Sequence, residues 1–328
     1  MLALLTFWIP APPAAIVVVA ALLLDFWIAD PWSWYHPVQA MGWAIGKGKD
    51  ILLAFQLSPW QQQVGGGLLT LLLLVGSYSY AAGAIAIAHH IHPWAGLATH
   101  AVLLASCLGA RSLRRSALSV VEPLREGNLP RARQLLSRYV GRDTDTLETS
   151  EICRAAIETV AENTPDGATA PLFYGLIGGA PLAFAYKALS TLDSMIGYRR
   201  EPYIHLGRIP ARLEDIVTWL PCRLTVLTLS LWSKRPFDYL RKCRQDATQD
   251  PSPNSGWSEA AFAWLLQVRL GGTNVYQGVA KIKPFLGQAI EPLAPKTVLS
   301  SSTWLRRVMV MWVVVVLLVY WLNWLGRQ

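Results

Sequence analysis

The sequence predicts an all-α protein: a polytopic helical membrane protein with a helical cytoplasmic region and a candidate re-entrant helical hairpin. Of its 328 residues, 53% are hydrophobic and only 15% are charged, whereas soluble domains carry about 25% charged residues. The charged residues gather in loops between long apolar stretches. Because every backbone polar group in lipid needs a partner within its own helix, we expect these stretches to be helical.

Four apolar stretches approach or reach the length that crosses a bilayer, about 20 residues. They lie at residues 13–24 (extended at either end), 66–88, 94–110 and 308–325. The chain therefore divides into three parts: N-terminal membrane helices at 1–110 with a polar loop at 25–65, a charged region at 111–306, and a C-terminal transmembrane helix at 307–328.

Basic residues mark the ends of these stretches, as at Arg111, Arg114, Arg115, Arg306 and Arg307. Basic loops beside membrane helices tend to stay on the cytoplasmic side. The net charge of +8 therefore indicates membrane orientation and not nucleic acid. We expect a multi-pass protein of the cell inner membrane, embedded in the lipid bilayer, with its active site facing the cytoplasm.

The 111–165 segment is soluble in character and reads as two helices. The second is expected to begin near Asp145, because Asp145 and Glu148 have the spacing of a capping box.

Residues near 168–190 are apolar and long enough to span, but Gly178-Gly179-Ala180-Pro181 interrupts them. Proline inside a helix removes a hydrogen bond and costs about 3 kcal/mol, so two half-helices that enter and leave on one side would fit the break. The next apolar stretch, 216–232, contains a proline and an arginine and is also a poor spanning helix. If both span, the loop between them faces outward. We favour the arrangement in which neither spans and the whole charged region is cytoplasmic.

Three carboxylates form a stripe on the helix expected at 149–163. Glu151, Glu158 and Glu162 fall within about 40° of one another at the α-helical period. Such carboxylates repel unless a cation lies among them, and Arg154 alone cannot neutralise all three. Oxygen ligands in this number suit Mg²⁺ carrying a nucleotide. The alternative is an ordinary solvated helix face.

Further polar groups border the apolar stretches. Asn163 and Asp166 lie in the turn after the acidic helix, Lys187 lies at the end of the interrupted stretch, and Asp193 follows that stretch. An ionisable group near the membrane is a functional candidate, although a lysine there can also simply reach lipid phosphate. The N-terminal region adds Asp25, Asp30 and His36.

A Pro/Gly/Asn-rich loop at 246–257 precedes a helix expected to start near Ser258 and to stop at Gly271-Gly272. The free N–H groups of such a helix start can receive phosphate, and a simple helix cap is the alternative. The sequence contains no Walker-type phosphate loop, no dinucleotide-binding glycine fingerprint and no serine nucleophile elbow. The residues therefore leave the mode of nucleotide binding open.

Five long motifs occur in series along the chain. The first is LLLDFWIADP with His36-Pro37, and the second is ETVAENTPDGATAPLFYGLIGGAPLAFAYKALSTLDSMIGY. They are followed by ARLEDIVTWLPCRLT, DPSPNSGWSEAAFA and VRLGGTNVYQG. In content and order, the series resembles the CbiB/CobD family of cobalamin biosynthesis, over the chain from about Leu23 to Gly287.

The resemblance implies an adenosylcobinamide-phosphate synthase, a ligase that forms a C–N bond. Such an enzyme joins the propionate side chain of adenosylcobyric acid, a corrinoid, to aminopropanol or its O-phosphate, with ATP and Mg²⁺ as cofactors. The implied course is activation of the carboxylate as an acyl phosphate and then attack of the amine. Whether the amine is phosphorylated stays open, as does association into a homo-oligomer or with other membrane enzymes of the pathway.

The resemblance also implies the site. The expected catalytic residues are Glu151, Glu158, Glu162, Asn163, Asp166 and Asp193. The expected metal ligands are Glu158, Glu162 and Asp166. The expected substrate contacts are Lys187, Arg199, Arg212, Asp215, Asp246, Asn254, Glu259, Asp25, Asp30 and His36. One position departs from the family: Asp250 stands where histidine is common in a D-x-x-x-H-x-S-P-N pattern, so its role is left open.

Two other functions compete with the enzyme. A membrane transporter is favoured by the interrupted apolar stretch and the ionisable groups near the membrane, but the spanning stretches are few and no inverted repeat is visible. A noncatalytic membrane sensor would leave the acidic stripe without a role. Convergence of Glu158, Asp166, Asp193 and Asn254 on one pocket would favour the enzyme.

Overall fold

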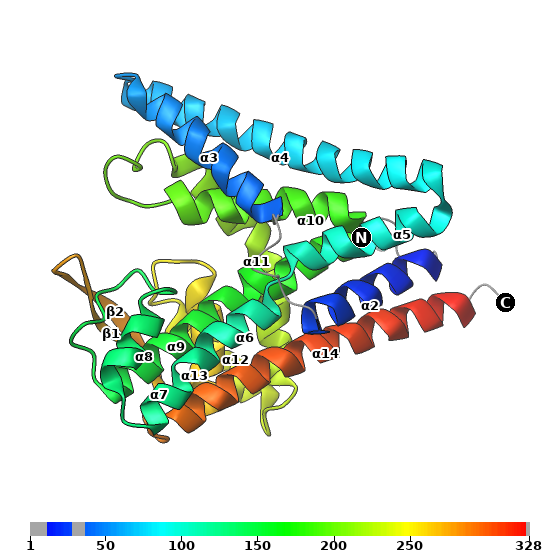
Figure 1. Cartoon of the computed structure of the whole chain (residues 1–328). Helices are drawn as coiled ribbons and strands as arrows, with labels where there is room; N and C mark the ends of the chain where they lie inside the picture. The colour runs from blue at the N-terminus through cyan, green and yellow to red at the C-terminus, as the bar shows by residue number, and fades with distance from the viewer. Residues whose placement is uncertain (1–11, 28–36, 326–328) are drawn as a thin grey trace. The chain divides into compact units, whose positions relative to one another are not determined.

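The structure is a computed structural model that describes residues 12–27 and 37–325 (Figure 1). Its residues form two compact units. The first unit comprises Met1–Gly109, Ala170–Thr218 and Val313–Gln328, and the second comprises Ala110–Thr169 and Trp219–Trp312. The charged region expected at 111–306 is therefore divided, because residues 170–218 are grouped with the N-terminal helices.

Helices build the first unit, and α10 is at its centre. Its elements are α2 (Pro12–Trp27), α3 (Pro37–Ala54), α4 (Pro59–Ile91), α5 (Pro93–Cys107), α10 (Ala170–Ile196), the start of α11 (Arg208–Ser230) and the end of α14 (Pro295–Leu325). Helix α10 packs against α2, α3, α4 and α5. A buried apolar cluster joins α3, α10 and the segment after α10: Ile45, Leu192, Ile196 and Leu206.

Helix α10 is interrupted where the sequence predicts it. Gly179 has φ 68° and ψ −167°, a conformation that is essentially open only to glycine. Tyr174, before the break, stacks on Tyr186, after it, with ring centroids 5.1 Å apart. In a continuous helix these residues would lie about 18 Å apart, so the chain folds back on itself. The N–H of Ala180 after the break donates to Nε2 of buried His100 on α5 at 2.8 Å. The predicted hairpin is thus confirmed.

The second unit combines helices with a β-hairpin. Its elements are α6 (Ala110–Ser119), α7 (Val121–Arg125), α8 (Leu129–Leu136), α9 (Thr149–Thr164), the π-helical turn η1 (Pro165–Thr169), α12 (Pro236–Ala247), α13 (Ser255–Leu266), β1 (Arg269–Tyr276), β2 (Val279–Gly287) and the remainder of α11 and α14. Helix α9 packs against α6, α8 and α13, and α12 and α13 contact β2 (Figure 1).

The hairpin is an addition to the all-α fold class, which is otherwise confirmed. The helix expected to continue to Gly271-Gly272 ends earlier, where Gln267 turns left-handed with φ 58°. The antiparallel strands pair Tyr276 with Val279, which leaves Gln277-Gly278 as the loop. Both loop residues have positive φ, 51° and 77°, as the twist of a two-residue hairpin loop requires.

The capping box expected at Asp145 is wrong. Helix α9 begins at Thr149, and Glu148 at its N-cap makes no side-chain capping bond. The segment before α9 is held by the β-hairpin instead: Asp143 donates its N–H to the carbonyl of Val275 at 2.8 Å, and its carboxylate accepts from two N–H groups of the hairpin loop at 3.0 and 2.8 Å. The two helices expected over 111–165 are replaced by α6, α7, α8 and α9.

Four helical stretches among the described residues are long and apolar enough to cross a membrane: Pro59–Ile91, Pro93–Arg125, Thr149–Ile196 and Pro295–Leu322. The expected spans at 66–88, 94–110 and most of 308–325 fall within them. The first expected span lies in a shorter apolar helix, Ala15–Trp27. The 216–232 stretch is not among the four, whereas 168–190 lies in the third.

Candidate active site

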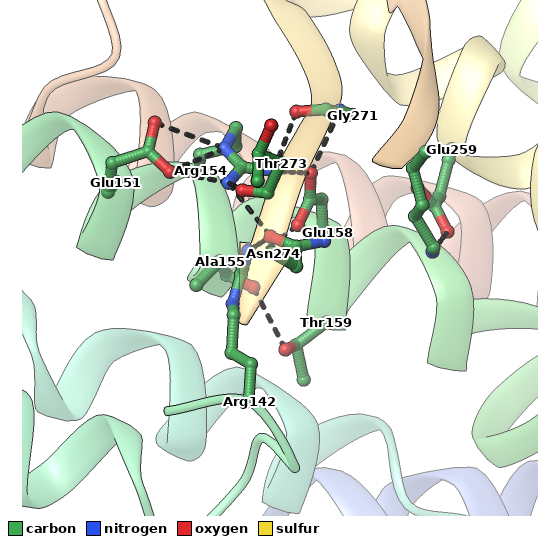
Figure 2. Close-up of polar contacts among 11 residues, drawn as sticks. Arg142, Glu151, Arg154, Ala155, Glu158, Thr159, Glu259, Gly271, Thr273 and Asn274 are labelled. Atoms are coloured by element: carbon green, nitrogen blue, oxygen red, sulfur yellow. Dashed lines mark hydrogen bonds and ion pairs between the residues drawn. The ribbon is translucent and has the colours of Figure 1, made fainter. Parts of the chain in front are cut away.

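The acidic stripe on α9 meets an arginine (Figure 2). Arg154 reaches Glu151 with its Nε, 3.1 Å from Oε2, and Glu158 with its Nη1, 2.8 Å from Oε1. The i, i+3 and i, i+4 spacings place these side chains on one helix face. This face is not an ordinary solvated one, because Arg154 and Glu158 are only 4% and 6% exposed.

A second arginine balances the charge. Arg142, from the segment before α9, donates from Nη2 to Oε2 of Glu158 at 2.8 Å and from Nη1 to the side-chain oxygen of Asn274 on β1. The N–H of Gly271 donates to Oε1 of Glu158 at 2.9 Å. Both oxygens of Glu158 therefore already bind protein groups. We call this set the Arg–Glu network: Arg142, Glu151, Arg154, Glu158 and Asn274.

Strand β1 completes the network because glycine lets it approach closely (Figure 2). Arg154 donates to the carbonyl oxygens of Gly271 at 2.7 Å and of Thr273 at 3.2 Å, and to Oδ1 of Asn274 at 2.9 Å. Gly271 has φ +82°, and a Cβ there would lie 1.9 Å from the carbonyl oxygen of Pro284. The glycine in the GGTN motif is thus a steric requirement of the site.

A cavity of about 650 Å³ borders the network, with Glu151, Arg154 and Arg269 in its lining. Arg269 is held over the ring of Phe285, 4.6 Å from its centroid. Arginines recognise carboxylates and phosphates through charge-assisted hydrogen bonds. Glu291 also lines this cavity, and the N–H groups of Arg154 already bind protein oxygens, so Arg269 is the side chain here that suits an anionic ligand.

A smaller cavity of about 120 Å³ is lined by both charges and amides. Its polar lining comprises Arg142, Glu158, Thr159, Glu162, Asn163, Asn274 and Lys283. Glu162 and Asn163 are exposed at this cavity. Three of the predicted catalytic residues, Glu158, Glu162 and Asn163, are thus brought together here.

Glu259 forms a buried ion pair beside this cavity. The Nζ of Lys283 lies 3.0 Å from its Oε1, and Glu259 is 0% exposed. Burial raises the pKa of the Glu259 carboxyl, Lys283 opposes that shift, and the charges of Glu162 and Glu158 add to it. Its other oxygen, Oε2, accepts no hydrogen bond from the described residues. Lys283 was not among the site residues predicted from the sequence, because no motif or periodicity near it in the chain indicates a function.

The expected metal ligands do not gather as a group of three. Among the described residues, no set of three or more His, Cys, Asp or Glu side chains could hold a metal ion, and Glu158 is bound by two arginines. Magnesium carried by a nucleotide commonly uses only one or two protein carboxylates, with phosphate and water as the other ligands. Glu162, exposed at the small cavity, fits that requirement.

Asp166 and Asn254 are connected through α11. The carboxylate of Asp166 acts electrostatically on Cys222, whose thiol donates to the carbonyl oxygen of Asn254 at 3.3 Å. Arg223 donates from Nη1 to Oδ1 of Asn254 at 2.8 Å. Asp246 has a different environment: its Oδ2 accepts from the Trp264 indole and the Gly287 N–H at 2.8 and 2.7 Å, which ties α12 to α13 and β2.

Other expected site residues lie in the first unit. Asp193 and Asp215 both interact electrostatically with the buried Glu214, and Arg199 interacts with Asp215. Lys187 is half-buried and Arg212 is exposed. Asp25 is half-buried on α2, whereas Asp30 and His36 lie outside the described residues. Of the four residues expected to converge, Asp193 belongs to the first unit and Glu158, Asp166 and Asn254 to the second.

Glu214 predicts a pH dependence of stability. Burial is the largest cause that raises its pKa, from 4.5 to about 7; a hydrogen bond from Thr218 lowers it, and the charges of Asp193 and Asp215 raise it further. A carboxyl with a raised pKa stabilises the fold when protonated, so this stabilisation is complete below 4.5 and is lost as pH rises through about 7. We expect the Tm to fall between about pH 5 and pH 8, and Glu214→Gln to reduce that fall, as thermal unfolding in detergent would measure. This assignment would be contradicted if the Tm of Glu214→Gln fell with pH as steeply as the Tm of Glu126→Gln, which replaces an exposed carboxylate.

Comparisons with known proteins agree with the motif series. The model of the family described as CobD/Cbib protein matches residues 18–305. "Cobalamin biosynthesis protein CobD" of Synechocystis sp. is 45% identical over 91% of this chain and 89% of its own length. The protein of the same name from Geobacter metallireducens is 46% identical over 85% and 88%, and "Cobalamin biosynthesis protein CbiB" of Salmonella arizonae is 42% identical over 82% and 86%.

No solved structure matches the chain. The family assignment therefore rests on sequence, on a match that covers both units of the fold and includes the residues of the Arg–Glu network. The chain belongs to the CobD/CbiB family of cobalamin biosynthesis proteins.

Proposed function

We propose that the protein is an ATP-dependent amide ligase that joins the propionate of adenosylcobyric acid to aminopropanol or its O-phosphate. The observation that carries the proposal is the Arg–Glu network with its two adjoining cavities. A buried, charge-balanced cluster built from three separate segments is an expensive arrangement, since desolvating each ion is costly. Such clusters in polar cavities are typical of sites that bind charged ligands.

The two cavities differ in the ligands that they suit. The 650 Å³ cavity would bind phosphate oxygens through Arg269, with the positive charge of Arg154 and the Gly271 backbone close by. The 120 Å³ cavity would take the small amine, because Glu162 and the amide of Asn163 offer acceptors to an ammonium group. Its remaining polar groups orient the amine by hydrogen bonding and exclude bulk water.

ATP supplies the phosphoryl group that activates the propionate, so that phosphate and not hydroxide leaves when the amine attacks. The residues of the chain perform the supporting steps. Glu162 would hold Mg²⁺ at the small cavity or accept the proton that the ammonium must lose before it is a nucleophile. Lys283 and Arg154 would offset the negative charge that develops during the transfer. Basic residues such as Arg111 and Arg306 next to apolar helices support a cytoplasmic site at the inner membrane.

Complementation tests the proposal. In a corrinoid auxotroph that lacks this step, we expect the wild-type chain to restore growth on cobyric acid. Glu162→Gln removes an exposed carboxylate at the small cavity, so it is expected to lower the rate of ATP-dependent amide formation about 10-fold or more. The rate is measured with purified protein in detergent.

Glu126→Gln is the matched control, because Glu126 is an exposed carboxylate at the end of α7. All strains should grow on cobinamide, the product of the step. Normal turnover by Glu162→Gln would remove Glu162 from the site. Uptake of a solute by wild-type proteoliposomes without amide formation would instead favour a transporter and overturn the ligase.

A further inference from the structure

Arg223 contacts two tryptophans in the second unit. Its guanidinium carbon lies 4.8 Å from the ring centroid of Trp219, one turn earlier on α11, and 4.8 Å from that of Trp257 on α13. Nη1 donates to Oδ1 of Asn254 at 2.8 Å. The rings of Trp219 and Trp257 both lie close to the guanidinium, whose hydrogen bonds go to Asn254 and to the side chain of Cys222.

Like Arg269, and unlike Arg142 and Arg154, Arg223 has no carboxylate ion-pair partner among the described residues. Arg142 and Arg154 each pair with Glu158. Burial is the main cause that lowers the pKa of Arg223. A half-buried guanidinium without an anion is unfavourable, and stacking on aromatic rings offsets that only in part.

The surroundings of Arg223 also come from three of the family motifs. Arg223 follows Leu220-Pro221-Cys222, Asn254 and Trp257 belong to the DPSPNSGW motif, and Asp166 of the ENTPDG motif acts on the neighbouring Cys222. The polar groups of these distant segments meet at one place, where Arg223 has no carboxylate ion-pair partner among the described residues. A planar guanidinium recognises carboxylate and phosphate oxygens in bidentate fashion.

We propose that Arg223, in contact with Trp219 and Trp257, binds an oxyanion group of a substrate: the free carboxylate of the corrinoid or a phosphate of the nucleotide. This inference rests on the proposed function for the identity of the ligands. A lipid phosphate has the same chemistry, and the membrane setting makes it the source that a test has to separate from a substrate.

Direct binding separates these sources. Affinities of the detergent-purified protein are measured for cobyric acid, for cobinamide, which carries an amide in place of that carboxylate, and for ATP. Arg223→Met keeps the length of the side chain but removes its charge. We expect it to weaken either cobyric acid or ATP by about 10- to 100-fold, the loss of one or two charge-assisted hydrogen bonds, while cobinamide is unaffected.

Arg223→Lys keeps the charge but loses the planar fork, so we expect an intermediate loss for the same ligand. Arg307→Met is the matched control, since Arg307 stacks on Trp304 at 4.4 Å and is exposed; it should bind as the wild type does. The Tm of each variant is measured alongside. If Arg223→Met proves to be unfolded, the affinities of Arg223→Lys decide the test.

Several outcomes would overturn the inference. The inference is wrong if folded Arg223 variants bind both cobyric acid and ATP with normal affinity. It is also wrong if the variants lose equal affinity for cobyric acid and cobinamide while their affinity for ATP is unchanged. An effect seen only as lost preference for liposomes with anionic lipid would assign Arg223 to a headgroup instead. If the wild-type protein binds neither cobyric acid nor ATP, the proposed function itself fails.

Discussion

Replacing Glu158 with leucine is expected to lower the free energy of unfolding by about 3–5 kcal/mol, because it leaves two buried guanidinium groups without their shared anion. Arg142 and Arg154 are 7% and 4% exposed, so water cannot replace the lost carboxylate. The measurement is thermal unfolding in detergent, with a fall in Tm on the order of 10 °C.

Glu151→Gln is the control for this prediction. Glu151 pairs with the same Arg154, but its side chain is 39% exposed, and exposed ion pairs contribute only about 0–1 kcal/mol. The triple variant Arg142→Met, Arg154→Met, Glu158→Leu should recover part of the loss, since it removes all three charges together. Equal effects of Glu158→Leu and Glu151→Gln would show that the network contributes little.

Replacing Gly271 with alanine is expected to lower the free energy of unfolding by more than about 3 kcal/mol and to abolish growth on cobyric acid. The new Cβ would lie 1.9 Å from the carbonyl oxygen of Pro284, so β1 and β2 must separate or shift their register. The same shift moves the N–H that binds Glu158 and the carbonyl that binds Arg154. Tm and complementation measure the two consequences.

Gly278→Ala separates steric clash from backbone strain. Gly278 also has a positive φ, +77°, but a Cβ there meets nothing within 4 Å. Gly278→Ala should therefore lower the free energy of unfolding only by the strain of a left-handed residue, about 1–2 kcal/mol, and should leave growth on cobyric acid intact. If Gly271→Ala is no worse than Gly278→Ala, the close approach of the strands at Gly271 is not what the site requires.

Local patterns in the sequence predicted the elements whose cause is local. The acidic stripe follows from helical periodicity, and the break in α10 follows from adjacent glycine and proline residues, as the stacked Tyr174 and Tyr186 confirm. The β-hairpin was missed because Gly271-Gly272 resembles a helix end, although the positive φ of Gln277-Gly278 shows that the better turn signal lay a few residues further on.

Long-range partners could not be predicted from the chain. The Arg–Glu network needs Arg142 and Asn274, which lie 132 residues apart, and no periodicity connects them. The same holds for Lys283 and Glu259, 24 residues apart on a strand and a helix. The carboxylates and the adjacent Arg154 were therefore identified from the sequence, whereas Arg142 and Lys283 were not, and the choice between a metal and arginines as partners of the carboxylates needed the fold.

The contacts between Asp143 and the hairpin loop determine the point in translation at which this part of the fold can form. Asp143 binds the N–H groups of Gln277 and Gly278, which follow it in the chain by 134 and 135 residues. The neighbouring Arg142 likewise binds Asn274, which is made much later. A nascent chain that ends before β1 holds Arg142, Arg154, Glu151 and Glu158 without the strand that completes the Arg–Glu network. Membrane insertion of the N-terminal helices can precede this step, so the Arg–Glu network can be completed only near the end of translation, shortly before α14 is made.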